Sequence, residues 1–226
     1  MGVAGDRSPF VRLPLALAEP RRSNVDARRE TAVKGKYLKG KTIEFDGSQV
    51  SPLWAYENLD VQGDSIISFR GPCSLEPDSM VDAEDRKRKS TISSTDMLHF
   101  IVEYFDCRLT EIVLIQRLLV QVVMDLLREL IYEEAEVERE RDNIYGYPPD
   151  SDQRGKLSVS AATVSPVSGL IHLGLNIATE PAPVRTIGLE ELGVEDIDEF
   201  AVEVAKRFIE EVKSIKRDAS KMRPVY

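Results

Sequence analysis

The sequence predicts an α+β fold in which an antiparallel or mixed β-sheet is backed by helices. Three observations support this: strand-like and helix-like segments alternate irregularly along 226 residues, a long apolar helix follows residue 108, and a long amphipathic helix lies near the C-terminus. Irregular alternation argues against a doubly wound parallel sheet, in which strands and helices follow one another in turn. One domain, residues 41–226, is the simplest organisation for this length.

The N-terminal elements are short strands separated by turns. Residues 42–45 alternate polar and apolar side chains and end at a turn, so we expect a strand there. A helix should follow, with Ser51 as its N-cap and Pro52 at its first position, where no backbone donor is needed. Residues 65–69 predict a second strand, which the glycine and proline at 71–72 should end by interrupting regular pairing.

Two helices are predicted in the middle of the chain. Residues 77–95 are polar and carry charges of both signs, which is typical of a solvated loop. Asp96 should then cap a helix over 97–105, where apolar residues have helical spacing. In the second helix, 109–132, polar side chains occupy only a narrow stripe. We therefore expect it to be the core helix, covered by the sheet.

The C-terminal part continues with strands and ends in a helix. Residues 135–141 and 156–161 alternate with a period of two around a proline-containing turn, which predicts a β-hairpin with a long loop. Residues 170–177 predict a further strand of the same meander. Apolar side chains then recur at helical spacing over 196–216, after acidic residues that suit a helix N-terminus. This helix should also back the sheet.

Composition excludes several classes of protein. With 30 basic and 39 acidic residues the net charge is −9 and the pI is near 5.0, which disfavours a DNA-binding protein. The two cysteines have no CxxC spacing, so neither a disulfide framework nor a cysteine zinc site is expected, and a cytoplasmic location fits best. The longest apolar run, residues 112–127, is interrupted by polar residues, so no membrane span is predicted.

The first forty residues differ in charge from the rest. They carry nine basic and four acidic residues, a net charge of +5, which leaves −14 for the remainder. We interpret residues 1–40 as a basic leader that is disordered or results from an upstream start codon. An arginine-rich targeting peptide is the alternative.

Three segments, residues 45–55, 63–72 and 156–177, resemble an archaeal family of uncharacterised proteins called domain of unknown function 366. The likeness extends over about residues 41–222. It implies the fold of class II aminoacyl-tRNA synthetases, biotin protein ligases and lipoate ligases. The activity of the family is unassigned. The fold that it shares with the ligases makes binding of a small carboxylic acid or its adenylate the leading expectation.

A second resemblance concerns Lys156. The Asp142-Asn143 pair, followed by the strand that begins Gly155-Lys156, is similar to the ligase pattern, where an Asn-Asp pair precedes a strand whose lysine contacts the acyl-adenylate. This implies a catalytic Lys156, stabilising charge on a carboxylate and phosphate, with Asp142 and Asn143 binding substrate. The order of the pair is reversed relative to the ligases. The alternatives are a solvated lysine and two residues that shape a turn.

The expected nucleotide loop of the ligases has no clear counterpart. Where those enzymes have a glycine- and arginine-rich loop, this chain has one glycine, at 71, and then an acidic segment, so ATP and magnesium stay open as cofactors. Arg70 is a candidate for gripping a carboxylate or phosphate, or else pairs with a nearby carboxylate. Asp82, Glu84 and Asp85 are candidate magnesium ligands, or else belong to a solvated loop.

Two further polar residues lie on the predicted strand 170–177. His172 points away from the side chains on either side of it and, with Asn176, is a candidate substrate-binding residue. His99 is expected to be a packing residue of the predicted helix 97–105. Two histidines so far apart in sequence are not a metal signature, so no metal site is predicted from them.

Three functions follow from these residues. The first is an acyl transferase or ligase acting on a small carboxylic acid, with an acyl-carrying protein as a partner. The second is a non-catalytic ligand-binding protein that has lost nucleotide chemistry. The third is an interaction protein or homodimer that pairs exposed strand edges. Aminoacylation of tRNA is disfavoured, since no basic RNA-binding face is visible.

Overall fold

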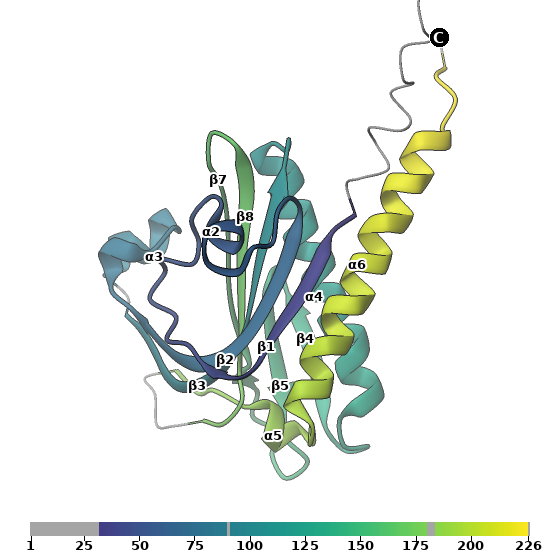
Figure 1. The fold of residues 1–226 in the computed structure, drawn as a ribbon. Helices are drawn as coiled ribbons and strands as arrows, with labels where there is room; N and C mark the ends of the chain where they lie inside the picture. Colours follow the sequence, from purple (N-terminus) through teal and green to yellow (C-terminus); the bar gives the residue numbers. More distant parts are fainter. Residues whose placement is uncertain (1–31, 90, 180–183, 226) are drawn as a thin grey trace, which may run out of the picture. The chain divides into compact units, whose positions relative to one another are not determined.

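The computed structural model describes residues 32–89, 91–179 and 184–225, which belong to one compact unit (Figure 1). At its centre is a five-stranded mixed sheet in the order β1-β2-β3-β8-β7. The pair β1–β2 is parallel and every other neighbouring pair is antiparallel. The strands are β1 (Lys34–Thr42), β2 (Ser65–Leu75), β3 (Ile92–Phe105), β7 (Ser158–Val164) and β8 (Ser168–Asn176). The predicted α+β class with a mixed sheet is confirmed.

Two long helices cover one face of this sheet, here called the helix face. They are α4 (Leu109–Leu130) and α6 (Ile197–Lys221), as predicted to within a few residues. Their apolar stripes pack against alternate strand residues such as Ile66, Phe100 and Leu173 to form the larger core cluster. Burial of these stripes is the main stabilising contribution to the fold.

The opposite face, here called the loop face, carries a smaller core cluster that includes Phe45, Phe69 and Met97. It is covered by the segment from β1 to β2, which contains α2 (Trp54–Leu59), and by the segment from β2 to β3. The latter contains the 3-10 helix η2 (Pro77–Ser79) and α3 (Ala83–Arg88). In Figure 1, α2 and α3 lie on the side of the sheet away from α6.

A second, three-stranded antiparallel sheet consists of β4 (Glu136–Glu140), β5 (Asn143–Tyr147) and β6 (Gly155–Lys156). It is joined to the larger core through Ile144, and the short helix α5 (Leu189–Leu192) belongs to the same core. Gly155 allows close approach of the chain near residue 186, because a Cβ at this position would lie 2.7 Å from the Thr186 carbonyl group. The predicted strand 156–161 is therefore wrong as one element: it is split at Leu157 between β6 and β7.

The predicted helix 97–105 is wrong, because these residues form most of strand β3. β3 is the central strand, paired with β2 on one side and β8 on the other. Both of its faces are covered, so its apolar residues form a continuous run instead of alternating. Such a run satisfies helical spacing as well as strand spacing. Asp96 accordingly lies within a strand and caps no helix.

The predicted end of the second strand is also wrong, because β2 continues through Gly71 and Pro72 to Leu75. The register with β3 shifts between Gly71 and Cys73, so the proline, which has no N–H, sits at a bulge. The Pro72 carbonyl accepts a hydrogen bond from the Phe45 N–H (2.8 Å), which anchors the covering loop to the bulge.

Three other boundaries differ from the predictions. The first strand occupies 34–42 instead of 42–45, so residues 34–40 of the predicted leader belong to the sheet; residues 1–31 lie outside the described residues. The first helix begins at Trp54 instead of Pro52, after Leu53 with a positive φ of 65°. The predicted loop 77–95 contains η2, α3 and the start of β3. No helix in the described ranges is long and apolar enough to span a membrane.

Candidate functional site

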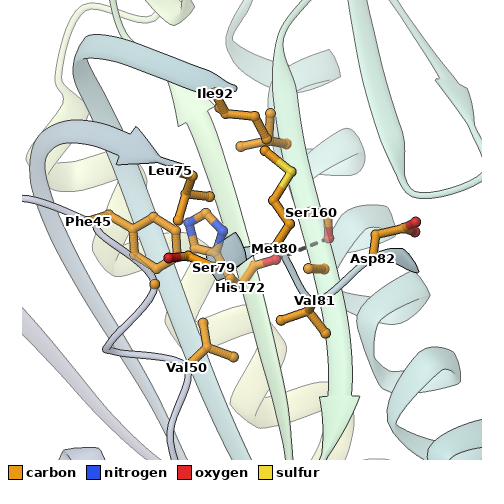
Figure 2. A pocket seen from close by; sticks show the side chains of 13 residues that line it. Phe45, Val50, Leu75, Ser79, Met80, Val81, Asp82, Ile92, Ser160 and His172 are labelled. Atoms are coloured by element: carbon orange, nitrogen blue, oxygen red, sulfur yellow. Dashed lines mark hydrogen bonds between the residues drawn. The ribbon is translucent and has the colours of Figure 1, made fainter. Parts of the chain in front are cut away.

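A cavity of about 60 Å³ lies on the loop face, between strands β7 and β8 and the segments that cover them (Figure 2). Its wall is mainly apolar and comes from four parts of the chain that are distant in sequence. Among the residues that the structure describes, Asp82 is the only one that lines it with a charged side chain. The apolar lining includes Phe45, Val50, Leu75, Met80, Ile92 and Val159.

His172 is the buried polar residue of this wall, and only 3% of its surface is exposed. Its ring stacks on that of Phe45, with 3.7 Å between ring centroids. Nε2 of His172 lies 3.0 Å from Nδ1 of His99, and Nε2 of His99 lies 3.1 Å from the Gly71 carbonyl oxygen. Two imidazoles and one backbone carbonyl thus form a hydrogen-bonded chain that leads from the bulge of β2 to the cavity.

Burial keeps both imidazoles neutral. It lowers the pKa of His99 to about 4, although the hydrogen bond to the Gly71 carbonyl and the charge of Asp96 oppose this shift. Burial, followed by the neighbouring His99, lowers the pKa of His172 well below its ordinary value. In a site of low polarity the charged form of an imidazole is disfavoured.

Strand register explains why the two rings meet. His99 is paired with Gly174 on β8, and His172 lies two residues before Gly174 on the same strand. A Cβ at Gly174 would lie 3.2 Å from Nε2 of His172 and 2.9 Å from Cε of Met97. The glycine therefore leaves the space across which the imidazoles make their contact.

Of the acidic candidates for magnesium, the structure describes the side chains of Asp82 and Glu84. Asp82 lines the cavity, and its Oδ1 accepts a hydrogen bond from the Glu84 N–H (2.7 Å) at the start of α3. Glu84 also pairs with Arg88 at the surface (3.5 Å). Of Asp85, the structure gives only its place in α3. Within the described ranges, no group of three or more histidine, cysteine or acidic residues is arranged to hold a metal ion.

Arg70 lies on the helix face, whereas His172 and the cavity lie on the loop face. The guanidinium group of Arg70 binds the carboxylate of Asp96, with Nε 2.9 and 3.0 Å from the two oxygens and Nη2 also in contact. This hydrogen-bonded contact is the main reason that the pKa of Arg70 is raised. The sheet separates Arg70 from the cavity.

Asp142 lies in the turn before β5, next to α4, and Asn143 is the first residue of β5. Asp142 forms an ion pair with Arg117 (2.9 Å) and receives a long hydrogen bond from Gln116 (3.4 Å). The side-chain amide of Gln116 also donates to the hydroxyl of Ser160 on β7 (2.7 Å). These contacts connect α4 to both sheets, and neither Asp142 nor Asn143 lines the cavity.

Lys156 and Asn176 lie together where the two sheets meet. The backbone of Lys156 donates to the Arg185 carbonyl (2.9 Å) and accepts from the Ile187 N–H (3.2 Å). The side-chain amide of Asn176 also donates to the Lys156 carbonyl (3.1 Å). The backbone of Lys156 is thus held from three directions, but the residue is not part of the cavity wall.

Comparison with known proteins identifies the family. Residues 35–223 match the family model described as Domain of unknown function (DUF366). An uncharacterised protein of Methanocaldococcus jannaschii is 36% identical over 189 residues, which cover 81% of each chain. The chain belongs to the DUF366 family. A solved protein of unknown function from Pyrococcus horikoshi is similar to it, with 38% identity, a TM-score of 0.78 and coverage of 86% of this chain and 100% of that one.

Two solved structures of ligases or ligase-like proteins share the fold of this DUF366 protein. A lipoate protein ligase-like protein of Thermoplasma acidophilum, solved with bound lipoic acid, has a TM-score of 0.53 at 14% identity and covers 82% of this chain and 93% of its own. A biotin protein ligase mutant of Aquifex aeolicus, solved in complex with biotin, has a TM-score of 0.51 at 17% identity, with coverages of 81% and 72%. At these identities the likeness establishes a shared fold, as the sequence predicted.

Only some of the site residues predicted for this DUF366 protein lie close together in the structure. Lys156 and Asn176 are neighbours, His172 lines the cavity, and Arg70 and Asp142 lie elsewhere. Sequence reasoning missed the covering residues Phe45 and Met80, because nothing local in their sequence shows which sheet they cover. It also placed His99 on a helix. A strand assignment for 92–105 would have put His99 on the face shared with Met97 and Ile101.

Proposed function

We propose that this DUF366 protein binds a small carboxylic acid that has an apolar tail, with the tail in the cavity and the carboxylate outside it. The observation that carries the proposal is the composition of the wall. Its described residues are apolar apart from a few polar groups, and Asp82 is the one charged side chain among them. Transfer of an apolar chain from water into such a site lowers the free energy of the system and so favours binding. A carboxylate there would lose hydration and meet a like charge.

Two structures of the same fold support the chemical class. The Thermoplasma acidophilum protein was solved with lipoic acid, and the Aquifex aeolicus biotin ligase mutant with biotin. Both ligands are carboxylic acids whose acid group ends an apolar chain. We transfer to this protein only that shared chemistry.

Calorimetric titration of the protein with lipoate, octanoate and biotin tests this proposal. Ala161→Leu would fill space beside His172 in the cavity wall, and we expect it to weaken binding of the preferred acid at least tenfold. Val164→Leu is the matched control, because Val164 lies on the same strand but outside the cavity and is 39% exposed. Equal affinities for both variants, or no binding of any acid, would contradict the proposal.

Acyl transfer is a second candidate function, favoured by the setting of Lys156. Its backbone is fixed by three hydrogen bonds, and its ammonium group has no ion-pair partner among the residues that the structure describes. Val159 of the cavity wall is three residues away, at most roughly 10 Å along an extended chain. A rigidly placed cation of this kind can stabilise negative charge that develops during acyl transfer.

The acyl group would come from an activated ester. The described residues of the cavity wall include no cationic side chain for a triphosphate, so they do not fit a nucleotide, and we derive no step through ATP or magnesium. In transfer from a thioester to an amine, the C–S bond breaks, a C–N bond forms, and the thiol leaves with the proton of the amine. The acceptor would be an acyl-carrying protein domain; the Thermoplasma ligase was studied with its E2 lipoyl domain.

The test is transfer of an octanoyl thioester to a lipoyl domain by the unaltered protein and by Lys156→Met. We expect transfer to fall at least 100-fold in the variant, while affinity for the free acid stays within twofold. Full transfer by Lys156→Met would remove Lys156 from the mechanism. Transfer of the free acid only in the presence of ATP and magnesium would replace the thioester route by ligation.

A further inference from the structure

We propose that His172 presents an unprotonated Nδ1 to the cavity, and that the cavity therefore selects a ligand whose apolar end carries a hydrogen-bond donor. The first part stands on the geometry of the hydrogen-bonded chain and on the burial of His172, which keeps its ring neutral. The second part rests on the proposed function, because it specifies which acids enter the cavity. The donor can be a hydroxyl, thiol or N–H group.

The protonation of the two rings follows from the Gly71 carbonyl at the end of the chain. A carbonyl oxygen can only accept a hydrogen bond, so Nε2 of His99, 3.1 Å away, must carry the proton. In a neutral imidazole the other nitrogen is then an acceptor, so Nδ1 of His99 accepts from Nε2 of His172 at 3.0 Å. The same rule leaves Nδ1 of neutral His172 with a lone pair.

The surroundings of His172 leave this lone pair available to a ligand in the cavity. No described residue makes a hydrogen bond to Nδ1, and the side chain is part of the cavity wall (Figure 2). Stacking on Phe45 and the contact with His99 fix the plane of the ring. Nδ1 is not among the fully buried side-chain atoms that lack a partner in the described residues, so it borders accessible space. A ligand that displaces water from it without donating a hydrogen bond loses affinity relative to a ligand that donates.

The size of the cavity limits the group that can donate. A volume of about 60 Å³ corresponds to roughly four to six water-sized positions at 10–15 Å³ each. It accepts a short chain end better than a large ring system. Among acids with an eight-carbon chain, 8-hydroxyoctanoate and dihydrolipoate bring a donor near this end, whereas octanoate and lipoate bring none.

The tautomer of His172 can be measured without any ligand. Long-range ¹H–¹⁵N correlation spectra at pH 7 distinguish a protonated imidazole nitrogen from an unprotonated one. We expect Nε2 of both histidines to be protonated and both Nδ1 atoms to be unprotonated. A proton on Nδ1 of His172, or a charged ring, would overturn the proposal whatever the protein binds.

Titration with two matched pairs of acids tests the selection itself. We expect 8-hydroxyoctanoate to bind at least fivefold more tightly than octanoate, and dihydrolipoate at least fivefold more tightly than lipoate. His172→Phe keeps an aromatic ring against Phe45 but removes the acceptor, and it should reduce both ratios to about one. Equal affinities within each pair for the unaltered protein would overturn the selection while leaving the proposed function intact. If no acid binds, the proposed function falls, and the tautomer spectrum still tests the first part.

Discussion

Arg70 and Asp96 bind each other across neighbouring strands β2 and β3, on the face of the sheet that α4 and α6 cover. Nε of Arg70 is within 3.0 Å of both carboxylate oxygens of Asp96, and Nη2 makes a further contact. Such a forked contact has a defined geometry and joins the two strands. Because the cavity lies on the other face, this pair contributes to the sheet and not to the wall that a ligand would touch.

Arg70→Ala should therefore lower stability and leave ligand binding unchanged. The pair is partly exposed, so we expect a loss of about 1 kcal/mol in the free energy of unfolding. Urea unfolding measures this loss, and Asp96→Asn is the matched variant that removes the charge from the other partner. Acid affinity should stay within twofold in both. A tenfold loss of affinity without loss of stability would instead assign Arg70 to the site.

Protonation of the buried histidines should destabilise the protein in weak acid. The pKa of His99 is lowered to about 4 in the folded state, whereas an unfolded histidine titrates near 6.5. The unfolded chain therefore binds protons first as the pH falls, so the stabilisation present above pH 6.5 is lost between about pH 6.5 and 4.

Urea unfolding at pH 7.5, 6.5 and 5.5 measures this loss. Carboxylates with lowered pKa, such as Asp198, lose their stabilising contribution mainly below the unfolded value of 3.8, so they act at lower pH. His99→Gln is the control, since glutamine does not titrate, and its stability should change less between pH 7.5 and 5.5. An equally steep dependence in the variant would show that other groups cause it.

Gly174→Ala should damage the contact between the two imidazoles. The added Cβ would lie 3.2 Å from Nε2 of His172 and 2.9 Å from Cε of Met97. The Met97 side chain can move, but the stacked His172 ring has little room, so we expect a loss of about 1–3 kcal/mol. The double variant with Met97→Ala separates the two contacts. Imidazole resonances that do not shift in Gly174→Ala would contradict this interpretation.

Asn176→Ala should loosen the junction between the two sheets. Its side-chain amide donates to the carbonyls of Lys156 (3.1 Å) and Ile187 (3.4 Å). Removing it leaves these acceptors with one donor fewer, at a cost of about 1–2 kcal/mol. Hydrogen exchange should become faster at the amides of Lys156 and Ile187. Unchanged exchange there, at unchanged stability, would show that the backbone contacts alone hold Lys156.

The long helices were predictable because their apolar and polar side chains keep a helical spacing over more than twenty residues, with a narrow polar stripe on α4 and an apolar stripe on α6. β3 was not, because burial on both faces removes the alternation that identifies a strand. The continuation of β2 beyond Pro72 could not be predicted either. A proline inside a strand requires a bulge, and the position of the bulge depends on the partner strand.

The candidate site, like the fold, could be predicted from the sequence only in part. His172 could be identified as a candidate because, on its own strand, it is a polar residue that points away from the apolar side chains on either side of it. Its partner His99 and its neighbour Phe45 reach it only through sheet register and loop packing, which are properties of the folded chain. Arg70 was assigned to substrate from a local motif, and the structure gives it Asp96 as a partner 26 residues away.

Four lysines follow one another along β1, at positions 34, 36, 39 and 41, and all four are exposed. β1 is an edge strand within the described residues, so one row of its backbone groups is free of a neighbouring strand. If a second copy of the protein paired with this edge of β1, its lysine ammonium groups would lie near those of the first copy. Their electrostatic repulsion would be screened by salt only in part. Lysines along an exposed edge oppose its pairing with the edge strand of another molecule, the usual hazard of an open sheet.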